Sequence, residues 1–214
     1  MKTIFIIGNI ASGKSAAARH LESRGALRID LDELARSLYV PDSALVDAIA
    51  SEFGPEVLDT DGGIDRAALA RRAFASPEDT ARLDALVHPV LVGQLANRLM
   101  PGVGCAAKLP AAPCTVVEVS APQGFAEAFG LADTVIAVTA PREVRRQRAC
   151  GRGMDPADFD RRAAVQPDEA ELRALADHVI DNTAGSDALF DALDRVVEGL
   201  GIELAPRKEP DHDV

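Results

Sequence analysis

The chain has few cysteines and no long hydrophobic run. Its 214 residues include three cysteines, Cys105, Cys114 and Cys150, an odd number with no Cys-x-x-Cys pair. This usage disfavours a disulfide framework or a cysteine metal site, and it predicts a reduced, cytoplasmic protein. The apolar run from Ile4 to Ile7 is far too short to cross a bilayer, so we expect neither a membrane span nor a signal peptide.

Positive charge is also scarce. The chain has 23 Lys and Arg residues against 34 Asp and Glu residues, a formal net charge of −11. Such a surface repels phosphate backbones and anionic lipid, which disfavours general binding to nucleic acid or membrane. Any phosphate that this chain binds must be held by a local cluster of positive groups. The length predicts one compact unit with an insertion, or two small lobes.

Short apolar runs alternate with helical patterns at both ends of the chain. The strands are expected at residues 3–7, 26–29, 115–119, 134–138 and 178–180, and helices fill most of the intervals. From about 32 to 100 the pattern is helical, with Asp65 and Ser76 as expected N-caps, and 101–113 is expected to be a loop. The fold class is therefore α/β, a parallel sheet flanked by helices, with an inserted helical lobe.

The residues from Gly8 to Ser15, Gly-Asn-Ile-Ala-Ser-Gly-Lys-Ser, match the phosphate-loop pattern G-x-x-x-x-G-K-[ST] at every required position. The motif follows a buried strand and opens a helix, which is where its mechanism requires it. Glycines let the backbone N–H groups turn toward a phosphate, and the helix N-terminus adds partial positive charge. We expect Lys14 to reach the β/γ-phosphates of ATP and the Ser15 hydroxyl to bind Mg²⁺. A glycine turn that only joins strand to helix is the alternative.

Acidic residues follow two of the expected strands. Asp30 and Asp32 come at the end of the second strand, where a carboxylate could orient an acceptor hydroxyl, take its proton, or hold a Mg²⁺-bound water. Asp30 could instead cap the following helix. Glu118, on the third strand, is a candidate for a second acid on the magnesium side, although one acid at a strand end is common.

Five arginines fall within eleven residues of this acidic chain, on a helix that Pro141 is expected to begin. At helical spacing most of them share one face, which suits a lid that closes over ATP and stabilises the transferring phosphoryl group. A solvated helix face is the alternative. The arginines are Arg142, Arg145, Arg146, Arg148 and Arg152.

Beyond the phosphate loop, the sequence resembles the dephospho-coenzyme A kinase family across most of residues 3–185. The matching segments are Ile29-Asp30-Leu31-Asp32, Phe53-Gly54-Pro55-Glu56-Val57-Leu58-Asp59, Asp65-Arg66-Ala67-Ala68-Leu69, Leu86-Val87-His88-Pro89, the arginines Arg148 and Arg152 with Gln166, and Ala176-Asp177-His178-Val179-Ile180-Asp181-Asn182. His88-Pro89 and Asp181-Asn182 are more specific to the family than the phosphate loop. The resemblance implies ATP-dependent, Mg²⁺-dependent phosphorylation of the ribose 3′-hydroxyl of dephospho-CoA, the last step of coenzyme A biosynthesis.

The resemblance also assigns roles to residues. It makes Asp32 the base facing the 3′-hydroxyl, with Lys14 and Arg148 as its catalytic partners, and it places His88 near the acceptor, although helix packing or a cap beside Pro89 is the alternative for His88. The residues implied to bind ATP are Gly8, Asn9, Ile10, Ala11, Ser12, Gly13, Lys14, Ser15, Ala16, Arg148, Arg152 and Asn182.

The resemblance implies a single kinase domain over residues 1–204. Its nucleotide core is 1–40 with 113–200, its acceptor-binding insert is 41–100, its lid is 141–176, and 205–214 is a tail. We expect a monomer or weak homo-oligomer whose partners are ATP and dephospho-CoA.

Two departures from the family pattern bear on the substrate. Ile7, Asn9 and Ala11 replace a threonine and two glycines of the family loop, and residues 119–124 replace its Val-Pro-Leu-Leu-Phe-Glu stretch, which shapes the acceptor pocket. A kinase of another acceptor is one alternative. The loop is reminiscent of deoxynucleoside kinases, but an aromatic base pocket is disfavoured by 4% aromatics, one Tyr and no Trp. The second alternative is a non-catalytic nucleotide-binding protein. A GTPase is disfavoured because no Asn-Lys-x-Asp motif is present.

Overall fold

The computed structural model describes residues 1–100 and 111–207, and the chain divides into two compact units. The first unit comprises residues 1–31 with 107–214, and the second comprises residues 32–106. Most of the loop predicted at 101–113, and the tail from 208 onward, lie outside the described residues. Within the described ranges, no helix combines the length and apolar character that a bilayer crossing requires.

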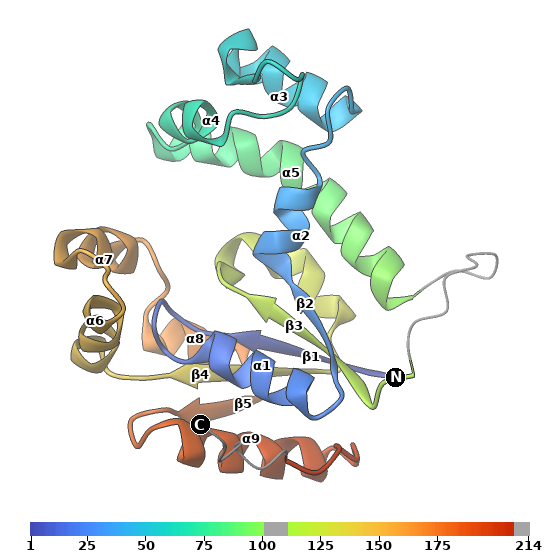
Figure 1. The fold of residues 1–214 in the computed structure, drawn as a ribbon, viewed down its shortest axis with the longest axis vertical. Helices are drawn as coiled ribbons and strands as arrows, with labels where there is room; N and C mark the ends of the chain where they lie inside the picture. The colour runs from blue at the N-terminus through green and yellow to red at the C-terminus, as the bar shows by residue number, and fades with distance from the viewer. Residues whose placement is uncertain (101–110, 208–214) are drawn as a thin grey trace, which may run out of the picture. The chain divides into compact units, whose positions relative to one another are not determined.

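The first unit is built on a five-stranded sheet in the order β2-β3-β1-β4-β5, in which every neighbouring pair is parallel (Figure 1). All five strands expected from the sequence are present, each within one residue of its expected bounds. A parallel order requires crossover connections, and the helices provide them. The strands are β1 (Lys2–Ile7), β2 (Leu27–Asp30), β3 (Cys114–Val119), β4 (Thr134–Thr139) and β5 (His178–Asp181).

Helices cover both faces of this sheet. Ile4 and Ile6 point to the face where α1 and α9 pack, and they belong to one fully buried apolar cluster with both helices. Phe5 points to the opposite face, where its ring meets Phe129 edge to face at 5.7 Å. Figure 1 shows α1 and α8 on opposite faces of the sheet. The elements of this unit are α1 (Lys14–Ser23), the 3₁₀ segment η2 (Pro122–Leu131), α6 (Arg142–Gly151), α7 (Pro156–Ala164), α8 (Glu169–Leu175) and α9 (Ser186–Gly199).

A buried polar cluster joins the end of α1 to α9. Asp194 Oδ1 of α9 lies 2.8 Å from His20 Nε2. Its Oδ2 lies 2.5 Å from Arg24 Nη1 and accepts two hydrogen bonds from Arg207, at 2.7 and 2.9 Å. Burial alone would raise the pKa of Asp194, but the hydrogen bonds from His20 and Arg207 and the charge of Arg24 lower it. Ala205 pairs its backbone N–H with the Arg24 carbonyl at 3.0 Å.

Within residues 32–100, the second unit consists of helices joined by turns, with one isolated bridge between Leu58 and Ile64 and no named strand. The N-caps expected at Asp65 and Ser76 are both present, since each side chain accepts backbone N–H groups of its own helix. An apolar cluster that includes Ile49, Val57 and Ala73 fills the unit. Its elements are α2 (Leu31–Ser37, beginning at the last residue of the first unit), α3 (Ala44–Phe53), η1 (Pro55–Val57), α4 (Arg66–Ala73) and α5 (Pro77–Leu99).

Candidate active site

The phosphate loop lies at the carboxyl end of the central strand β1 and leads into α1. Two of its glycines are required by close packing. A Cβ on Gly8 would stand 2.5 Å from the Val138 carbonyl oxygen, and a Cβ on Gly13 would collide with the side-chain amide of Asn182. Gly13 is also the N-cap of α1 and has no side chain with which to cap it, so the first N–H groups of the helix are left for an anion.

Ala11 takes a left-handed backbone conformation in this loop, with φ of +60°. A side chain disfavours that region because Cβ crowds the backbone, and glycine avoids the cost. The replacement of glycine by alanine at this position, noted in the sequence, therefore leaves the loop geometry in place at an energetic cost.

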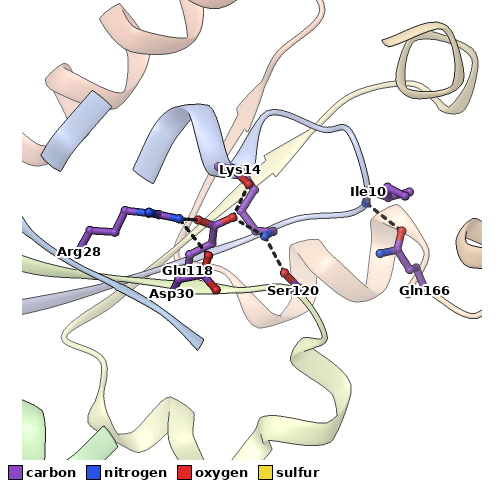
Figure 2. Close-up of polar contacts among 8 residues, drawn as sticks. Ile10, Lys14, Arg28, Asp30, Glu118, Ser120 and Gln166 are labelled. Atoms are coloured by element: carbon purple, nitrogen blue, oxygen red, sulfur yellow. Dashed lines mark hydrogen bonds and ion pairs between the residues drawn. The ribbon is translucent and has the colours of Figure 1, made fainter. Parts of the chain in front are cut away.

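Lys14 is held by residues of β3 and of the turn that follows it. Its Nζ donates to Glu118 Oε1 and to Ser120 Oγ, both at 2.8 Å (Figure 2). The Ser15 hydroxyl donates to the same Glu118 oxygen. Glu118, the candidate acid on the magnesium side, thus contacts both the lysine and the serine of the motif.

Glu118 remains ionised although it is only 4% exposed. Burial alone would raise the pKa of Glu118. The charge of Lys14, with hydrogen bonds from Lys14, Ser15 and Arg28, outweighs burial and lowers the pKa to about 2. A buried carboxylate thus lies beside the two residues expected to contact the phosphates and the metal ion.

The first half of the phosphate loop is tied to the segment between α7 and α8. Asn9 Nδ2 donates to the Pro167 carbonyl at 2.8 Å, and the Ile10 N–H donates to Gln166 Oε1 at 2.9 Å (Figure 2). Arg145 of α6 donates to the Ala140 carbonyl at 3.1 Å and to the Ile10 carbonyl of the loop at 3.5 Å. Burial and the neighbouring Arg142 charge lower the pKa of Arg145. These contacts fix the loop from the side of the predicted lid, 141–176.

The second half of the loop is tied to the end of β5. Asn182 Nδ2 donates to the Ser12 carbonyl at 2.7 Å, and the Asn182 carbonyl accepts from Arg148 Nη2 at 2.8 Å. Within residues 1–100 and 111–207, buried polar atoms of these three residues lack a partner: Ser12 Oγ, Arg148 Nη1 and Asn182 Oδ1. Buried donors and acceptors are normally paired, so these atoms indicate a place where a polar ligand would bind.

The five lid arginines do not share one environment. Arg142 and Arg146 pair with Asp160 of α7, at 2.7 and 3.5 Å, and are largely exposed. Arg145 and Arg148 instead turn toward the phosphate loop and Asn182. Arg152 is the exposed C-cap of α6. Helical periodicity alone did not distinguish these groups.

The two residues expected to serve the acceptor belong to the second unit. Asp32 is exposed in the first turn of α2, two residues after β2 ends. His88 lies within α5, partly exposed, with Nε2 3.4 Å from Asp84 one helical turn earlier. Their expected roles remain predictions. The remaining loop residues, Ser15 and Ala16, begin α1 and are partly exposed.

The residues near Ser15 fit a magnesium ion. Mg²⁺ prefers oxygen ligands, takes one or two from protein, and fills the rest of its shell with water and substrate phosphates. The Ser15 hydroxyl with the Glu118 carboxylate beside it provides such a set. Among the described residues, no cluster of three or more His, Cys, Asp or Glu side chains forms a protein-only metal site.

Sequence reasoning missed two participants in this site. Arg28 of β2 donates to Glu118 Oε2 at 2.7 Å and to Asp30 Oδ2 at 3.0 Å (Figure 2). Ser120 holds Lys14, as described above. Alternation along β2 places Arg28 and Asp30 on one face, but the partner strand was not identifiable from sequence.

Comparison with known proteins decides the family of this chain. The family profile described as dephospho-CoA kinase matches residues 2–188. The chain belongs to the dephospho-CoA kinase family. A dephospho-CoA kinase of Frankia casuarinae is 38% identical over 212 residues, 98% of this chain and 86% of that protein. A dephospho-CoA kinase of Anaeromyxobacter dehalogenans is also 38% identical, over 94% of this chain and 92% of that protein.

Solved structures share the fold of this chain. A crystal structure of a Thermus thermophilus protein is 32% identical, with a TM-score of 0.74 over 93% of this chain and 97% of that one. A dephospho-CoA kinase from Campylobacter jejuni shares the fold, with a TM-score of 0.65 over 94% of this chain and 98% of that one, at 23% identity. The resemblance to dephospho-CoA kinases and the expected parallel sheet flanked by helices are both confirmed.

Proposed function

We propose that this member of the dephospho-CoA kinase family transfers the γ-phosphoryl group of ATP to the ribose 3′-hydroxyl of dephospho-CoA. The observation that carries the proposal is the phosphate loop, in which Lys14 and Ser15 lie beside an ionised, buried carboxylate at the end of the central strand. The unpartnered polar atoms of Ser12, Arg148 and Asn182 support a polar ligand at the same end of the sheet.

In this proposal the loop provides most of the catalysis by position and charge. Backbone N–H groups from Gly8 to Ala16 surround the β-phosphate, and Lys14 neutralises charge on the transferring group. Arg148 and Arg152 of the lid region add positive charge over the nucleotide, with Asn182 near its base. Because transfer of a phosphoryl group needs few covalent steps from the protein, accurate placement accounts for most of the rate.

The Ser15 hydroxyl would hold Mg²⁺, supported by Glu118. When bound, the metal ion neutralises phosphate charge and helps to orient the β- and γ-phosphates. This role is compatible with Ser15 as seen here, since its hydroxyl need only exchange one oxygen partner.

The acceptor side of the proposal assigns Asp32 as the base. An exposed carboxylate at a helix start can accept a hydrogen bond from the 3′-hydroxyl and receive its proton as the phosphoryl group moves. His88 would contact the acceptor from the helical unit, 32–106. We further propose that the enzyme works in the cytoplasm as a monomer or weak homo-oligomer.

The direct test is acceptor-dependent ADP release. ATP and Mg²⁺ are supplied with dephospho-CoA, shikimate or a panel of nucleosides, and ADP formation is followed in a coupled assay. We expect dephospho-CoA to give the highest kcat/KM, with ³¹P NMR locating the new phosphate on the 3′-oxygen. Faster turnover of a nucleoside would refute the acceptor assignment, and ATP binding without transfer to any acceptor would refute the enzymatic one.

The role of Asp32 is tested by Asp32→Asn. The amide keeps the shape but cannot take a proton, so kcat should fall about 100-fold or more. Because Asp32 is exposed, the melting temperature should stay close to that of the wild type. Glu33→Gln, which changes the neighbouring exposed carboxylate, is the matched control and should retain most activity. An Asp32→Asn enzyme with near wild-type kcat would remove the base assignment.

A further inference from the structure

Arg28 belongs to the first unit, residues 1–31 with 107–214, which we call the nucleotide unit, and the proposed mechanism does not use its charge. Its side chain is 18% exposed, and its Nη2 contacts Glu118 Oε2 at 2.7 Å and Asp30 Oδ2 at 3.0 Å. Its Nε is buried and has no hydrogen-bond partner within residues 1–100 and 111–207. A buried donor without a partner is destabilising. Stability alone is therefore a weak reason for an arginine at this position.

Glu118 is divided between two cations. Its Oε1 accepts from Lys14 and Ser15, and its Oε2 accepts from Arg28 (Figure 2). Arg28 reaches it diagonally across the β2–β3 pairing, in which Arg28 is opposite Val116 and Asp30 is opposite Glu118. One buried carboxylate thus serves the motif lysine from one side and a strand arginine from the other.

This arrangement matters because Lys14 has two competing partners. To neutralise the phosphates of ATP, its ammonium group must give up its contact with Glu118. A buried carboxylate that loses its cation loses a large stabilisation. This loss would lower the affinity for ATP. Arg28 contacts the other oxygen and does not depend on Lys14. With Arg28 in place, Glu118 keeps a cation while Lys14 moves to the nucleotide.

We propose that Arg28 is a positioning residue that raises the affinity for ATP by holding Glu118 as Lys14 transfers from this carboxylate to the phosphates. The inference rests on the proposed function in one respect, that Lys14 binds the phosphates of ATP. It assigns to β2 a part in nucleotide binding that requires no contact between Arg28 and the nucleotide.

The test is a double-mutant cycle on ATP affinity. Wild type, Arg28→Met, Glu118→Gln and the double variant are titrated with ATP by calorimetry, in EDTA and again with Mg²⁺. Arg28→Met alone should weaken ATP binding about 10-fold, which corresponds to about 1.4 kcal/mol. In the Glu118→Gln background the same change should cost about threefold or less, because no carboxylate then retains Lys14.

Steady-state kinetics provide a second readout. Arg28→Met should raise KM for ATP and leave kcat at saturating ATP within about threefold of wild type. The reason is that Lys14 is still present in this variant, although Glu118 holds it back from the phosphates. Arg28→Lys, which keeps the charge, should recover most of the affinity. Arg19→Met removes one exposed cation from α1 and serves as the matched control, with ATP affinity unchanged within about twofold.

Several results would overturn the inference. Equal losses of affinity in the wild-type and Glu118→Gln backgrounds would mean that Arg28 acts through its general field and independently of this carboxylate. Unchanged ATP affinity in Arg28→Met would mean that Arg28 has no role in ATP binding. If Arg28→Met proves unfolded by circular dichroism, Arg28→Gln, which also removes the charge, replaces it in the cycle. Wild-type protein that binds ATP but does not phosphorylate dephospho-CoA would refute the proposed function while the cycle still decides the role of Arg28.

Discussion

The two units of this chain treat charge differently. The nucleotide unit has exposed pairs such as Arg142–Asp160, but it also buries two shared carboxylates: Glu118 is 4% exposed and accepts from three residues, and Asp194 is 7% exposed and accepts from three others. In the helical unit, 32–106, charged pairs such as Arg82–Glu52 and Arg72–Glu56 are largely exposed. Exposed pairs contribute little to stability, whereas breaking a buried pair leaves an uncompensated charge.

The two units differ in how firmly they hold their functional groups. The nucleotide unit holds its functional groups in fixed relations, as positioning catalysis requires. The residues expected to meet the acceptor, Asp32 and His88, are exposed or partly exposed, as groups that contact a second substrate must be. Four changes test this contrast, from the largest expected effect to the smallest.

Lys14→Ala should have the largest effect. It removes the charge that, in the proposed function, neutralises the transferring phosphoryl group, so kcat/KM should fall by roughly 1,000-fold or more, comparable to losing a principal electrostatic donor. Steady-state kinetics measure the loss, and circular dichroism checks the fold. Lys2→Ala, at the exposed start of β1, is the control and should keep near wild-type kinetics. Retention of most activity by Lys14→Ala would contradict the assignment.

Glu118 should give the nucleotide unit an acid-sensitive stability. The folded-state pKa of about 2 lies below its ordinary value of 4.5, so the stabilisation is fully present above pH 4.5 and is lost as pH falls toward 2. The shift corresponds to at most about 3 kcal/mol. Urea unfolding of the nucleotide-free protein at pH 3 and pH 6 measures the part of this stabilisation that is lost by pH 3.

The control for this pH effect is Glu118→Gln, which cannot titrate. Its unfolding free energy should change less than that of the wild type between the same two pH values. Identical pH slopes for the two proteins would show that Glu118 is not the group responsible.

Ala11→Gly should act in the opposite direction. Because Ala11 has φ of +60°, glycine relieves a left-handed conformation, and the free energy of unfolding should rise by about 1 kcal/mol. Thermal unfolding measures the change. Ala17→Gly, in the buried interior of α1, should destabilise instead. A loss of stability in Ala11→Gly would mean that the alanine side chain packs usefully in the loop.

Arg82→Ala should have the smallest effect. Arg82 pairs with Glu52 and Asp79 on the surface of the helical unit and lies over the Phe53 ring at 5.7 Å. It also lowers the pKa of Asp79. These contacts are screened by solvent and salt, so kinetics should match wild type and the small change in melting temperature should shrink in about 0.5 M NaCl. A large loss of stability would break the contrast between the units.

The features predictable from sequence are those encoded locally. The phosphate loop, the strand before it and the N-caps at Asp65 and Ser76 each depend on a few consecutive residues, and the structure confirms them. A positive φ at Ala11 followed from no local signal, because alanine rarely adopts it.

The features that could not be predicted depend on pairing between distant segments. Arg28 meets Glu118 because β2 pairs with β3, 90 residues away in sequence. Gln166 reaches Ile10 across 156 residues. The periodicity of α6 correctly gathered its arginines on a helix but could not divide those that contact Asp160 from those that face the loop, since the division depends on what packs against each side.

The cluster around Asp194 connects the chain's last described residues to the end of α1. Ala205 contacts Arg24, and Arg207 contacts Asp194. Arg24 and Asp194 also pair with each other, and together these contacts hold the end of α1, which begins with Lys14. Proteolytic trimming after Leu204 would therefore remove the two hydrogen bonds from Arg207 to the buried Asp194. The C-terminal end of α1, the helix that begins with Lys14, would then be held less firmly.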